Sequence, residues 1–504
     1  MIGISRRRLY DTAMITLLIP GILFLLTWVR LIVAVPCCLA FVVAFGFYHR
    51  HDDRKELKSV FEKQPEIWKC SGLTIAFCFL CAVLWTYLSG IGGFFYQNDD
   101  FYGRNAIFHD LLEHDWPVRF SGTSYALTYY IGFWIVPALI GKFCAFIGGP
   151  EILWFAANYA LFAETVWFLF LLFLLFLSLL NVQSVFPAVG FLLLFVLFSG
   201  MDGLACFFLH DWTDQIEWWA HTWQFSSHTT CLFWVFNQAV PAWLATVLLL
   251  CLPERTDAYA LIGLLALPFS PLPLVGIVLL CAGMVFGKIL SALKDGRRSV
   301  QAVLLKPVSV CNLLSILGSI PCLLYLSSNA STGNVPLRAD LFLNVYSLPV
   351  AISRLILFSL VEWGIYAMIL LPFAYKDPVF WTVVLSLLLI PMFRVGYNMD
   401  FSMRASIPGL FVLSVYCAKF LKEWGLRKKL LAGCLILALL IGSITPMLEF
   451  QRGAYKVFRL GMFHQFSDPY KTVLHPYADT ENFICTDTDR SFFYRHLARR
   501  EKEN

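Results

Sequence analysis

Two adjacent carboxylates stand where a hydrophobic run ends. The run extends from Cys70 to Phe95, and Asn98-Asp99-Asp100 follows it. A carboxylate in such a position can act as the general base that takes a proton from an attacking hydroxyl group. Asn and Asp also cap helices by accepting hydrogen bonds from free N–H groups, and capping and catalysis can coexist. On position alone we favour Asp99 as the base, with Asp100 as its neighbour.

Arginines supply the complementary positive charge. A guanidinium group presents a planar fork of donors that matches phosphate oxygens bidentately. For Arg354 a structural role is as good an explanation as phosphate binding, because an arginine inside an apolar run can extend to the membrane surface or pair with another helix. The residues that we predict to bind a phosphate group are Arg404, Arg394, Arg104 and Arg354.

Acidic, aromatic and amide side chains in the same polar segments suit a sugar. Carboxylates and amides accept hydrogen bonds from hydroxyl groups, and aromatic faces fit pyranose rings by shape. The residues that we predict to contact the sugar or the acceptor are Asp202, Glu217, Trp218, His221, Asn398, Asp400 and Tyr129. Acid, aromatic and arginine side chains together indicate a site for a sugar attached to a phosphate. Direct displacement of that phosphate would invert the anomeric carbon.

One segment resembles a metal site. His109 and Glu113 share a helical face at a spacing of four, whereas His114 and Asp115 point elsewhere. A complete set of metal ligands would therefore need distant residues. We favour a solvated helix at the membrane interface and keep His109 and Glu113 as possible metal ligands.

The elements that position these residues are transmembrane helices. The 504 residues are 59% hydrophobic and 14% charged, with a mean hydropathy of +0.71, which excludes a soluble domain. A spanning helix needs roughly 20 apolar residues, and the sequence predicts an all-α, multi-pass bundle of about 11–14 helices in a lipid bilayer. The first apolar run, Met14 to Phe47, lacks a small-residue cleavage site and is interrupted by Arg30. It predicts a hairpin of two helices rather than a cleaved signal peptide.

Loop charges orient the bundle, because Lys and Arg accumulate in cytoplasmic loops. The segment from Gly200 to Thr230 has no Lys or Arg and is predicted to lie outside. The basic segments predicted to face the cytoplasm are 6–8, 49–69, 288–306 and 419–429.

These orientations define three regions. The C-terminal region is polar, so it forms either a structured cap or a tail on the membrane surface. The regions are an N-terminal hairpin with its cytoplasmic loop (1–69), a transmembrane core (70–447) with external loops 94–122, 200–230 and 394–405, and an extracytoplasmic tail (448–504).

A parity problem arises between Asp99 and Asp202, which should both be external. Three apolar segments separate them, so one of the three does not span. The segments are Ser124–Ile147, Ile152–Leu180 and Ser184–Ser199. With its tyrosines, Pro137 and Lys142, Ser124–Ile147 is our candidate for an interfacial or re-entrant segment.

The chain resembles a known family of membrane enzymes. The resemblance is to the GT-C superfamily of glycosyltransferases, and within it to the bacterial protein-mannosyltransferase and aminoarabinose-transferase branch. The resemblance lies in the first external loop, in the segments Asn98-Asp99-Asp100, Asp115-Trp116-Pro117-Val118 and Tyr129-Tyr130. Ser227-His228-Thr229-Thr230, Phe233 to Gln238 and Asn398 to Pro408 look like segments of bacterial relatives. Two features depart from that branch, namely an extra pair of helices at the N-terminus and Asp where Glu is common as the second acid.

The resemblance implies a GT-C-like helix bundle and a polyprenyl-phosphate sugar donor. It further implies transfer to a glycan, lipid or protein acceptor on the extracytoplasmic side of a bacterial plasma (inner) membrane, with an Asp of the first external loop as base. Metal dependence stays open, because some GT-C enzymes use a divalent cation such as Mg²⁺ or Mn²⁺ and others do not. The sequence has no glycine-rich phosphate loop and no nucleic-acid-binding element, so neither nucleotide-sugar donors nor nucleic acids are expected.

Two other functions are compatible with a bundle of this kind. A transporter or flippase of lipid-linked glycans would carry ionisable groups near the middle of the membrane, on broken helices in repeated halves. A glycan polymerase or ligase would place arginines and a histidine in a large external loop, and Gly200–Thr230 contains no Arg.

Overall fold

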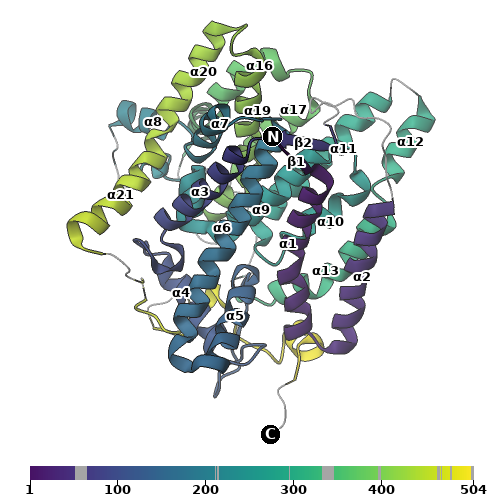
Figure 1. Ribbon diagram of the computed structural model, residues 1–504, viewed down its shortest axis with the longest axis vertical. Coiled ribbons are helices and arrows are strands. Elements are labelled where there is room, and N and C mark those ends of the chain that lie inside the picture. The colour runs from purple at the N-terminus through teal and green to yellow at the C-terminus, as the bar shows by residue number, and fades with distance from the viewer. Residues whose placement is uncertain are drawn as a thin grey trace.

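The computed structural model describes residues 1–50, 65–210, 212, 215–293, 296–331, 346–395, 399–462, 466, 468–476 and 480–500 (Figure 1). Most of these residues are helical. The first helices are α1 (Arg6–Trp28), α2 (Leu31–Arg50), α3 (Gly72–Leu88), α4 (Phe101–Glu113), α5 (Gly132–Gly148), α6 (Leu153–Leu179), α7 (Val185–Val196), α8 (Asp202–Leu209), α9 (His228–Cys251) and α10 (Tyr259–Leu264). They are followed by α11 (Pro271–Ala292), α12 (Arg297–Leu305), α13 (Val310–Leu326), α15 (Leu348–Ser359), α16 (Ile365–Ala374), α17 (Pro378–Leu389), α18 (Asp400–Ala405), α19 (Ile407–Trp424), α20 (Lys429–Gly442) and α21 (Ile444–Leu460).

The described helices confirm an all-α protein of multi-pass character. Eight of them are long and apolar enough to cross a membrane, which is fewer than the dozen or so apolar runs suggested. Several runs instead form apolar helices of at most 17 residues. The eight segments are Arg6–Trp28, Leu31–Arg50, Pro150–Leu179, His228–Cys251, Pro271–Ala292, Arg298–Leu326, Leu348–Ala374 and Lys429–Leu460. The shorter ones are Gly72–Leu88, Gly132–Gly148, Val185–Val196 and Pro378–Met392.

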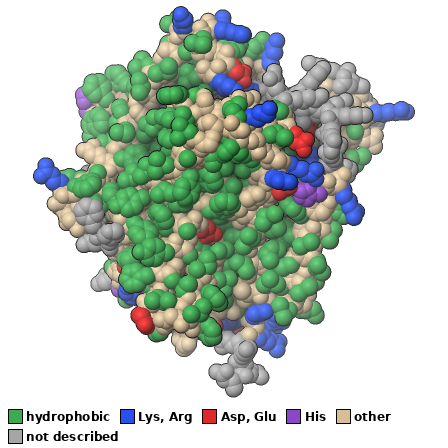
Figure 2. Space-filling model, viewed as in Figure 1, with side chains coloured by type: hydrophobic (Ala, Val, Ile, Leu, Met, Phe, Trp, Pro, Cys, Tyr) green, Lys and Arg blue, Asp and Glu red, His purple; other side chains and the backbone are tan. Residues whose placement is uncertain are grey.

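The bundle is built around α9, of whose apolar stretch 94% is buried. α6 and α19 pack directly against it. The peripheral helices present Leu, Ile and Phe outward, and in lipid such exposure carries no hydrophobic penalty. Figure 2 shows hydrophobic side chains over the broad middle of one face, with Lys and Arg gathered in the upper part and along the lower margin.

The N-terminal hairpin forms as the sequence predicts. α1 ends at Trp28 and α2 begins at Leu31, so the break falls at Arg30. The C-terminal segment stabilises this break, because the backbone N–H of Arg30 donates to Leu497 and its Nε donates to the Ala498 carbonyl. At the other end of the hairpin, strand β1 (Ile2–Ser5) pairs antiparallel with β2 (Ile67–Cys70).

α5 reaches only part of the way along the bundle. Its first residue, Gly132, donates from the backbone to the Pro268 carbonyl, at the junction between α10 and α11. The next residue, Phe133, packs against Phe168, which is the sixteenth of the 27 residues of α6. α5 then runs antiparallel to α6 to the start of that helix. The segment expected not to span is therefore a helix that begins beside the middle of α6.

The C-terminal region folds back onto the α4 end of the bundle, which lies low in Figure 1. Strand β4 (Ile484–Cys485) pairs antiparallel with β3 (Ala126–Leu127), and the hydroxyl of buried Tyr494 donates to the Leu127 carbonyl. The described part of the region is thus a packed cap rather than a surface tail. α21 continues to Leu460, so the expected boundary after Met447 falls inside a helix.

The cap also binds α4 through a buried carboxyl group. The Val473 N–H donates to Asp110 at 2.9 Å. Burial raises the pKa of Asp110 to about 6, against the opposing effect of the Val473 hydrogen bond. The folded state therefore binds this proton more tightly than the unfolded chain does, so the contribution of Asp110 to stability falls as the pH rises from its ordinary pKa of 3.8 to about 6.

Asp110→Asn is accordingly expected to stabilise the cap at neutral pH. Asparagine keeps an oxygen that accepts from Val473 and removes the buried charge. The free energy of unfolding should rise by at most about 3 kcal/mol. Thermal unfolding and limited proteolysis in detergent measure the difference between the two proteins. The gain in stability is expected at about pH 7.5. It should be absent near pH 4, where the side chain at position 110 is neutral in the folded wild type as well as in the variant. A variant less stable than wild type at neutral pH would contradict this account.

Candidate functional site

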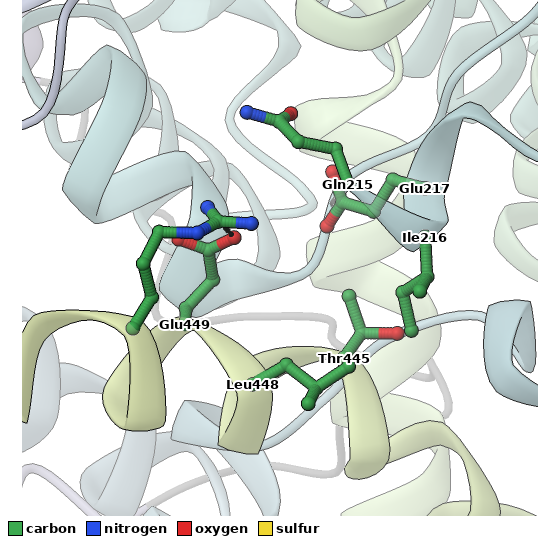
Figure 3. Close-up of a pocket in the computed structure, with 7 residues that line it drawn as sticks. Gln215, Ile216, Glu217, Thr445, Leu448 and Glu449 are labelled. Atoms are coloured by element: carbon green, nitrogen blue, oxygen red, sulfur yellow. Dashed lines mark hydrogen bonds and ion pairs between the residues drawn. The ribbon is translucent and has the colours of Figure 1, made fainter. Parts of the chain in front are cut away.

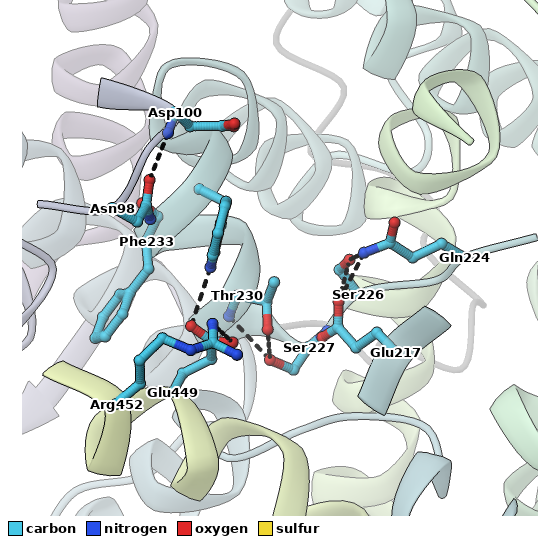
Figure 4. Close-up of polar contacts among 11 residues, drawn as sticks. Asn98, Asp100, Glu217, Gln224, Ser226, Ser227, Thr230, Phe233, Glu449 and Arg452 are labelled. Carbon is cyan, nitrogen blue, oxygen red and sulfur yellow. Dashed lines mark hydrogen bonds and ion pairs between the residues drawn. The ribbon is translucent and has the colours of Figure 1, made fainter. Parts of the chain in front are cut away.

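The acidic segment is fixed to a break in α9. Val235 has non-helical backbone angles, with φ −139° and ψ 38°, so the helix is interrupted there. The backbone carbonyl of Phe233, just before the break, accepts from the Asn98 side-chain amide at 2.9 Å, and the Asn98 side-chain oxygen Oδ1 accepts from the Asp100 N–H at 3.1 Å (Figure 4). Buried Asn98 thus sets the position of both carboxylates that follow it.

The two carboxylates have different partners. Asp100 accepts from Arg104 at 2.8 Å and is committed to an ion pair one helical turn away. Asp99 is exposed, receives a hydrogen bond from the Tyr102 hydroxyl, and pairs with no Lys or Arg among the described residues. Asp99 is therefore the freer of the two carboxylates. Neither belongs to the helix interior, since α4 begins at Phe101.

The same Asp–Arg arrangement occurs a second time. Asp400 and Arg404 pair across one turn of α18 as Asp100 and Arg104 pair across one turn of α4. In both pairs the carboxylate is close to half exposed, at 44% and 45%, and the guanidinium is about 90% buried. Burial by itself lowers the pKa of Arg404, but Asp400, Tyr130 and Tyr129 together outweigh this effect, so the net pKa is raised. Arg404 therefore keeps its charge.

Each guanidinium also has a buried N–H group that remains unpaired. Arg104 Nη1 and Arg404 Nε have no hydrogen-bond partner among the described residues. A buried, unpaired, charged donor is costly, and an anion would satisfy it. Tyr129 and Tyr130 lie within electrostatic range of both guanidiniums, with their own rings 3.7 Å apart. Burial raises the pKa of both tyrosines, so their hydroxyls stay protonated and can donate.

A second polar cluster surrounds Glu217, in the short η3 helix (Ile216–Trp218). Glu217 is 3% exposed and accepts from the Ser227 N–H at 2.9 Å, from Ser226 at 2.6 Å and from Gln224 at 2.9 Å (Figure 4). Burial raises its pKa, and the negative charge of Asp202 adds to the effect. Cys231 lies within electrostatic range of both Glu217 and Arg404. The Glu217 cluster therefore adjoins the pair of buried arginines, Arg104 and Arg404.

A pocket lies between this cluster and α21 (Figure 3). It is small, with room for about one water molecule. Glu449 lies on its α21 side, where it accepts from Arg452 at 2.7 Å and from the Trp234 indole at 3.0 Å. The residues that line the pocket are Gln215, Ile216, Glu217, Thr445, Leu448, Glu449 and Arg452. Sequence reasoning missed Glu449 and Arg452, although their spacing of three on a strongly amphipathic segment was a usable signal.

A third carboxyl group, Glu362, lies beside Asp202 within the bundle. It is in the π-helical segment Leu360–Gly364, midway along the Leu348–Ala374 span, and it accepts from the Trp219 indole at 2.9 Å. Asp202 accepts from Thr445 at 2.7 Å, and its carboxyl group lies within electrostatic range of Glu362.

The remaining predicted residues have various positions. Trp218 is partly exposed and donates to Gln224, and His221 is exposed. Arg354 is exposed on α15, where its guanidinium lies 4.3 Å from the centre of the Tyr346 ring and donates to that hydroxyl, so the structure does not bring it to Arg104. Arg394 is half-buried. Asn398 lies outside the described residues.

The segment considered as a metal site has another role. His109 stacks on Trp154 at 3.8 Å and pairs with Asp468 of the cap at 3.0 Å, while Glu113 is 3.8 Å away. Within the described part of the chain no three His, Cys, Asp or Glu residues gather as metal ligands would. The expected solvated helix is wrong, because α4 is buried along most of its length under α5 and the cap.

Comparison with known proteins returned no match, either among family models, among curated proteins or among solved structures.

Proposed function

We propose that the protein is an inverting GT-C-type glycosyltransferase that moves a sugar from a polyprenyl-phosphate donor to an acceptor on the extracytoplasmic side of a bacterial plasma membrane. The observation that carries the proposal is the arginine pair. Arg104 and Arg404 are buried, and each has an N–H group without a partner among the described residues. Arg104 pairs with Asp100, next to Asp99, and both arginines lie within electrostatic range of Tyr129 and Tyr130. A phosphate would satisfy those donors, and a base lies next to it.

The chemistry needs few groups. Asp99 takes the proton of the acceptor hydroxyl, whose oxygen forms a bond to the anomeric carbon as the bond from that carbon to the phosphate oxygen breaks. The electron pair leaves with the polyprenyl phosphate, where the guanidiniums of Arg104 and Arg404 stabilise the charge. Attack opposite the leaving group inverts the anomeric carbon. The ion pair with Arg104 gives Asp100 a positioning role in this scheme.

The experiment that tests the proposal is transfer of radiolabelled sugar from a panel of polyprenyl-phosphate sugars by the purified protein in lipid nanodiscs. We expect the label to leave the donor and the product to have the inverted anomeric configuration. No release of label from any donor, in nanodiscs that also contain total membrane lipid and membrane protein as acceptors, would overturn the proposal.

Transport of a lipid-linked glycan is the second candidate, and a specific feature favours it. Ionisable groups inside a membrane are costly and are characteristic of transport pathways. Glu362 and Asp202 form a pair of ionisable groups of this kind, and Glu362 lies in a π-helical turn midway along a spanning segment. Polymerase or ligase activity gains no similar support, because the described part of 200–230 contributes carboxylates and no arginine.

Glu362→Gln distinguishes the two candidates. Glutamine keeps an oxygen to accept from Trp219 and removes the titrating group. If the protein is a glycosyltransferase, we expect sugar transfer by the variant to stay within about threefold of wild type, as for a conservative change away from the reacting atoms. If it is a transporter, movement of a fluorescent polyprenyl-linked sugar across vesicle membranes should stop in the variant. The matched control is Glu423→Gln, an exposed carboxylate on α19.

A further inference from the structure

We infer that the C-terminal cap completes the catalytic site. In this arrangement Tyr470 is a positioning residue for the base Asp99, and Phe483 is a positioning residue for Tyr129, which lies beside the pair of buried arginines. The inference rests on the proposed glycosyltransferase function and adds two residues to the site from the far end of the chain. In the proposed reaction neither side chain touches the reacting atoms, so each acts through the residue that it contacts.

The cap packs along one face of α4. The α4 residues that contact it are Tyr102, Gly103, His109 and Asp110. Tyr102 and His109 are seven positions apart, as are the other two, and a spacing of seven is nearly two helical turns, so all four share one face. Arg104 is directed elsewhere, since its guanidinium lies over the ring of Phe236. The cap is therefore anchored along α4 up to the turn that holds Asp99.

Tyr470 packs against the residue that contacts the base. Its ring meets the Tyr102 ring edge to face, with centroids 5.6 Å apart, and its other partner is His475, on which it stacks at 4.3 Å. The Tyr102 hydroxyl in turn contacts Asp99. Tyr470 therefore limits where that hydroxyl and the Asp99 carboxylate can lie. Such control has a large effect on rate, because displacing a reacting group by about 1 Å can cost about 100-fold.

Phe483 packs against α4 at a glycine. A β-carbon at Gly103 would lie 2.9 Å from the Phe483 ring, so any larger residue there would push the ring away. The same ring is 5.1 Å from the ring of Tyr129, and the Phe483 carbonyl accepts from the N–H of the residue before Tyr129 at 2.8 Å. Tyr129 lies within electrostatic range of both buried arginines. Phe483 therefore holds a tyrosine in place at the predicted phosphate site.

The two aromatic residues of the cap reach different parts of the site. Tyr470 acts on the base, which affects the rate of transfer, and Phe483 acts on the phosphate site, which affects donor binding. A cap that only stabilised the fold would change both quantities together in both variants. The two roles therefore predict a crossed pattern of effects.

The first test measures single-turnover sugar transfer and equilibrium donor binding in nanodiscs. We expect Tyr470→Ala to lower the rate about 2–10-fold with donor affinity unchanged, and Phe483→Ala to weaken donor binding about 2–10-fold, as for one lost aromatic contact. Tyr470→Phe should keep the wild-type rate, because the ring makes the contact. Phe492→Ala, which removes a cap ring that is 59% exposed, is the control. Equal losses of rate and affinity in both variants would overturn the inference.

A double variant shows whether Tyr470 acts through Tyr102. Tyr102→Phe keeps the ring and removes the hydroxyl, and we expect it to lower the rate about tenfold, as for a lost hydrogen bond to a charged group. Adding Tyr470→Ala should then cost no further rate, because two residues that act through one contact are coupled. Additive losses would overturn a role that passes through Tyr102.

Chemical labelling of Asp99 tests the same contact without turnover. Carbodiimide-activated coupling of glycinamide, located by mass spectrometry, measures the reactivity of the carboxylate. We expect coupling at Asp99 to rise at least about threefold in Tyr102→Phe and Tyr470→Ala, because the hydroxyl that holds the carboxylate is lost or displaced, and to stay unchanged in Phe492→Ala. Unchanged coupling in the first two would overturn the positioning of the base. Increased coupling, with no sugar transfer by the wild type from any donor, would support the contact and place the failure in the proposed function.

Discussion

Asp99→Asn is expected to lower the rate of sugar transfer by about 10²–10⁴-fold, the range typical of removing a general base. Asparagine has nearly the same shape and cannot take up the proton of the attacking hydroxyl. Asp99 has no Lys or Arg partner among the described residues, so the substitution leaves no partner charge unpaired there. Donor affinity is expected to stay within about threefold of wild type, because Asp99 holds no phosphate-binding group in place.

Asp100→Asn is the matched comparison, because the two residues are adjacent and equal in chemistry. Loss of the Asp100 carboxylate breaks the ion pair with Arg104, so the guanidinium is free to bind the donor phosphate. We expect donor binding to be as tight as in wild type or tighter, with a smaller fall in rate than in Asp99→Asn. Single-turnover transfer and equilibrium donor binding give the two quantities separately. Full activity in Asp99→Asn, with the loss of rate in Asp100→Asn, would assign the base to Asp100 instead.

Several features of the fold could be predicted because they depend on local sequence. The hairpin break at Arg30 follows from one charge inside an apolar run, and the packed core follows from composition. Ser124–Ile147, with its tyrosines, Pro137 and Lys142, stays our prediction for the segment that does not span, and α5 within it begins beside the middle of α6. The number of full crossings could not be predicted in the same way, because an apolar run of 12–17 residues predicts burial without fixing the length of the helix.

The candidate site was predictable in its residue types and less so in its geometry. The spacing of four between Asp100 and Arg104, and between Asp400 and Arg404, is visible in the sequence, but the proximity of the two pairs depends on how α4 and α18 pack. The outward orientation of Arg354 depends on the rotation of its helix, which composition does not determine. Contacts such as Asp110 with Val473 join residues that are 363 apart, and no local pattern signals them.

Arg404→Gln is expected to weaken binding of the polyprenyl-phosphate donor by about 10–100-fold, which corresponds to a lost hydrogen bond to a charged group. Arg404 is 9% exposed and its Nε has no partner among the described residues, so a phosphate that reaches it binds in a setting with little competing water. Arg404→Lys should recover part of the affinity, since lysine restores the charge without the fork of donors.

The double variant shows whether the two arginines hold one phosphate. If Arg104 and Arg404 bind the same phosphate, the losses of donor affinity caused by Arg104→Gln and Arg404→Gln should be non-additive. Two groups that bind the same ligand atoms are energetically coupled. Donor binding is measured by displacement of a fluorescent polyprenyl phosphate, with Arg490→Gln, 91% exposed and remote from the site, as the control. Added salt should weaken binding by the wild type less than it would at a surface site, because buried charges are screened little. Wild-type affinity in both single variants and in the double would contradict a phosphate site here.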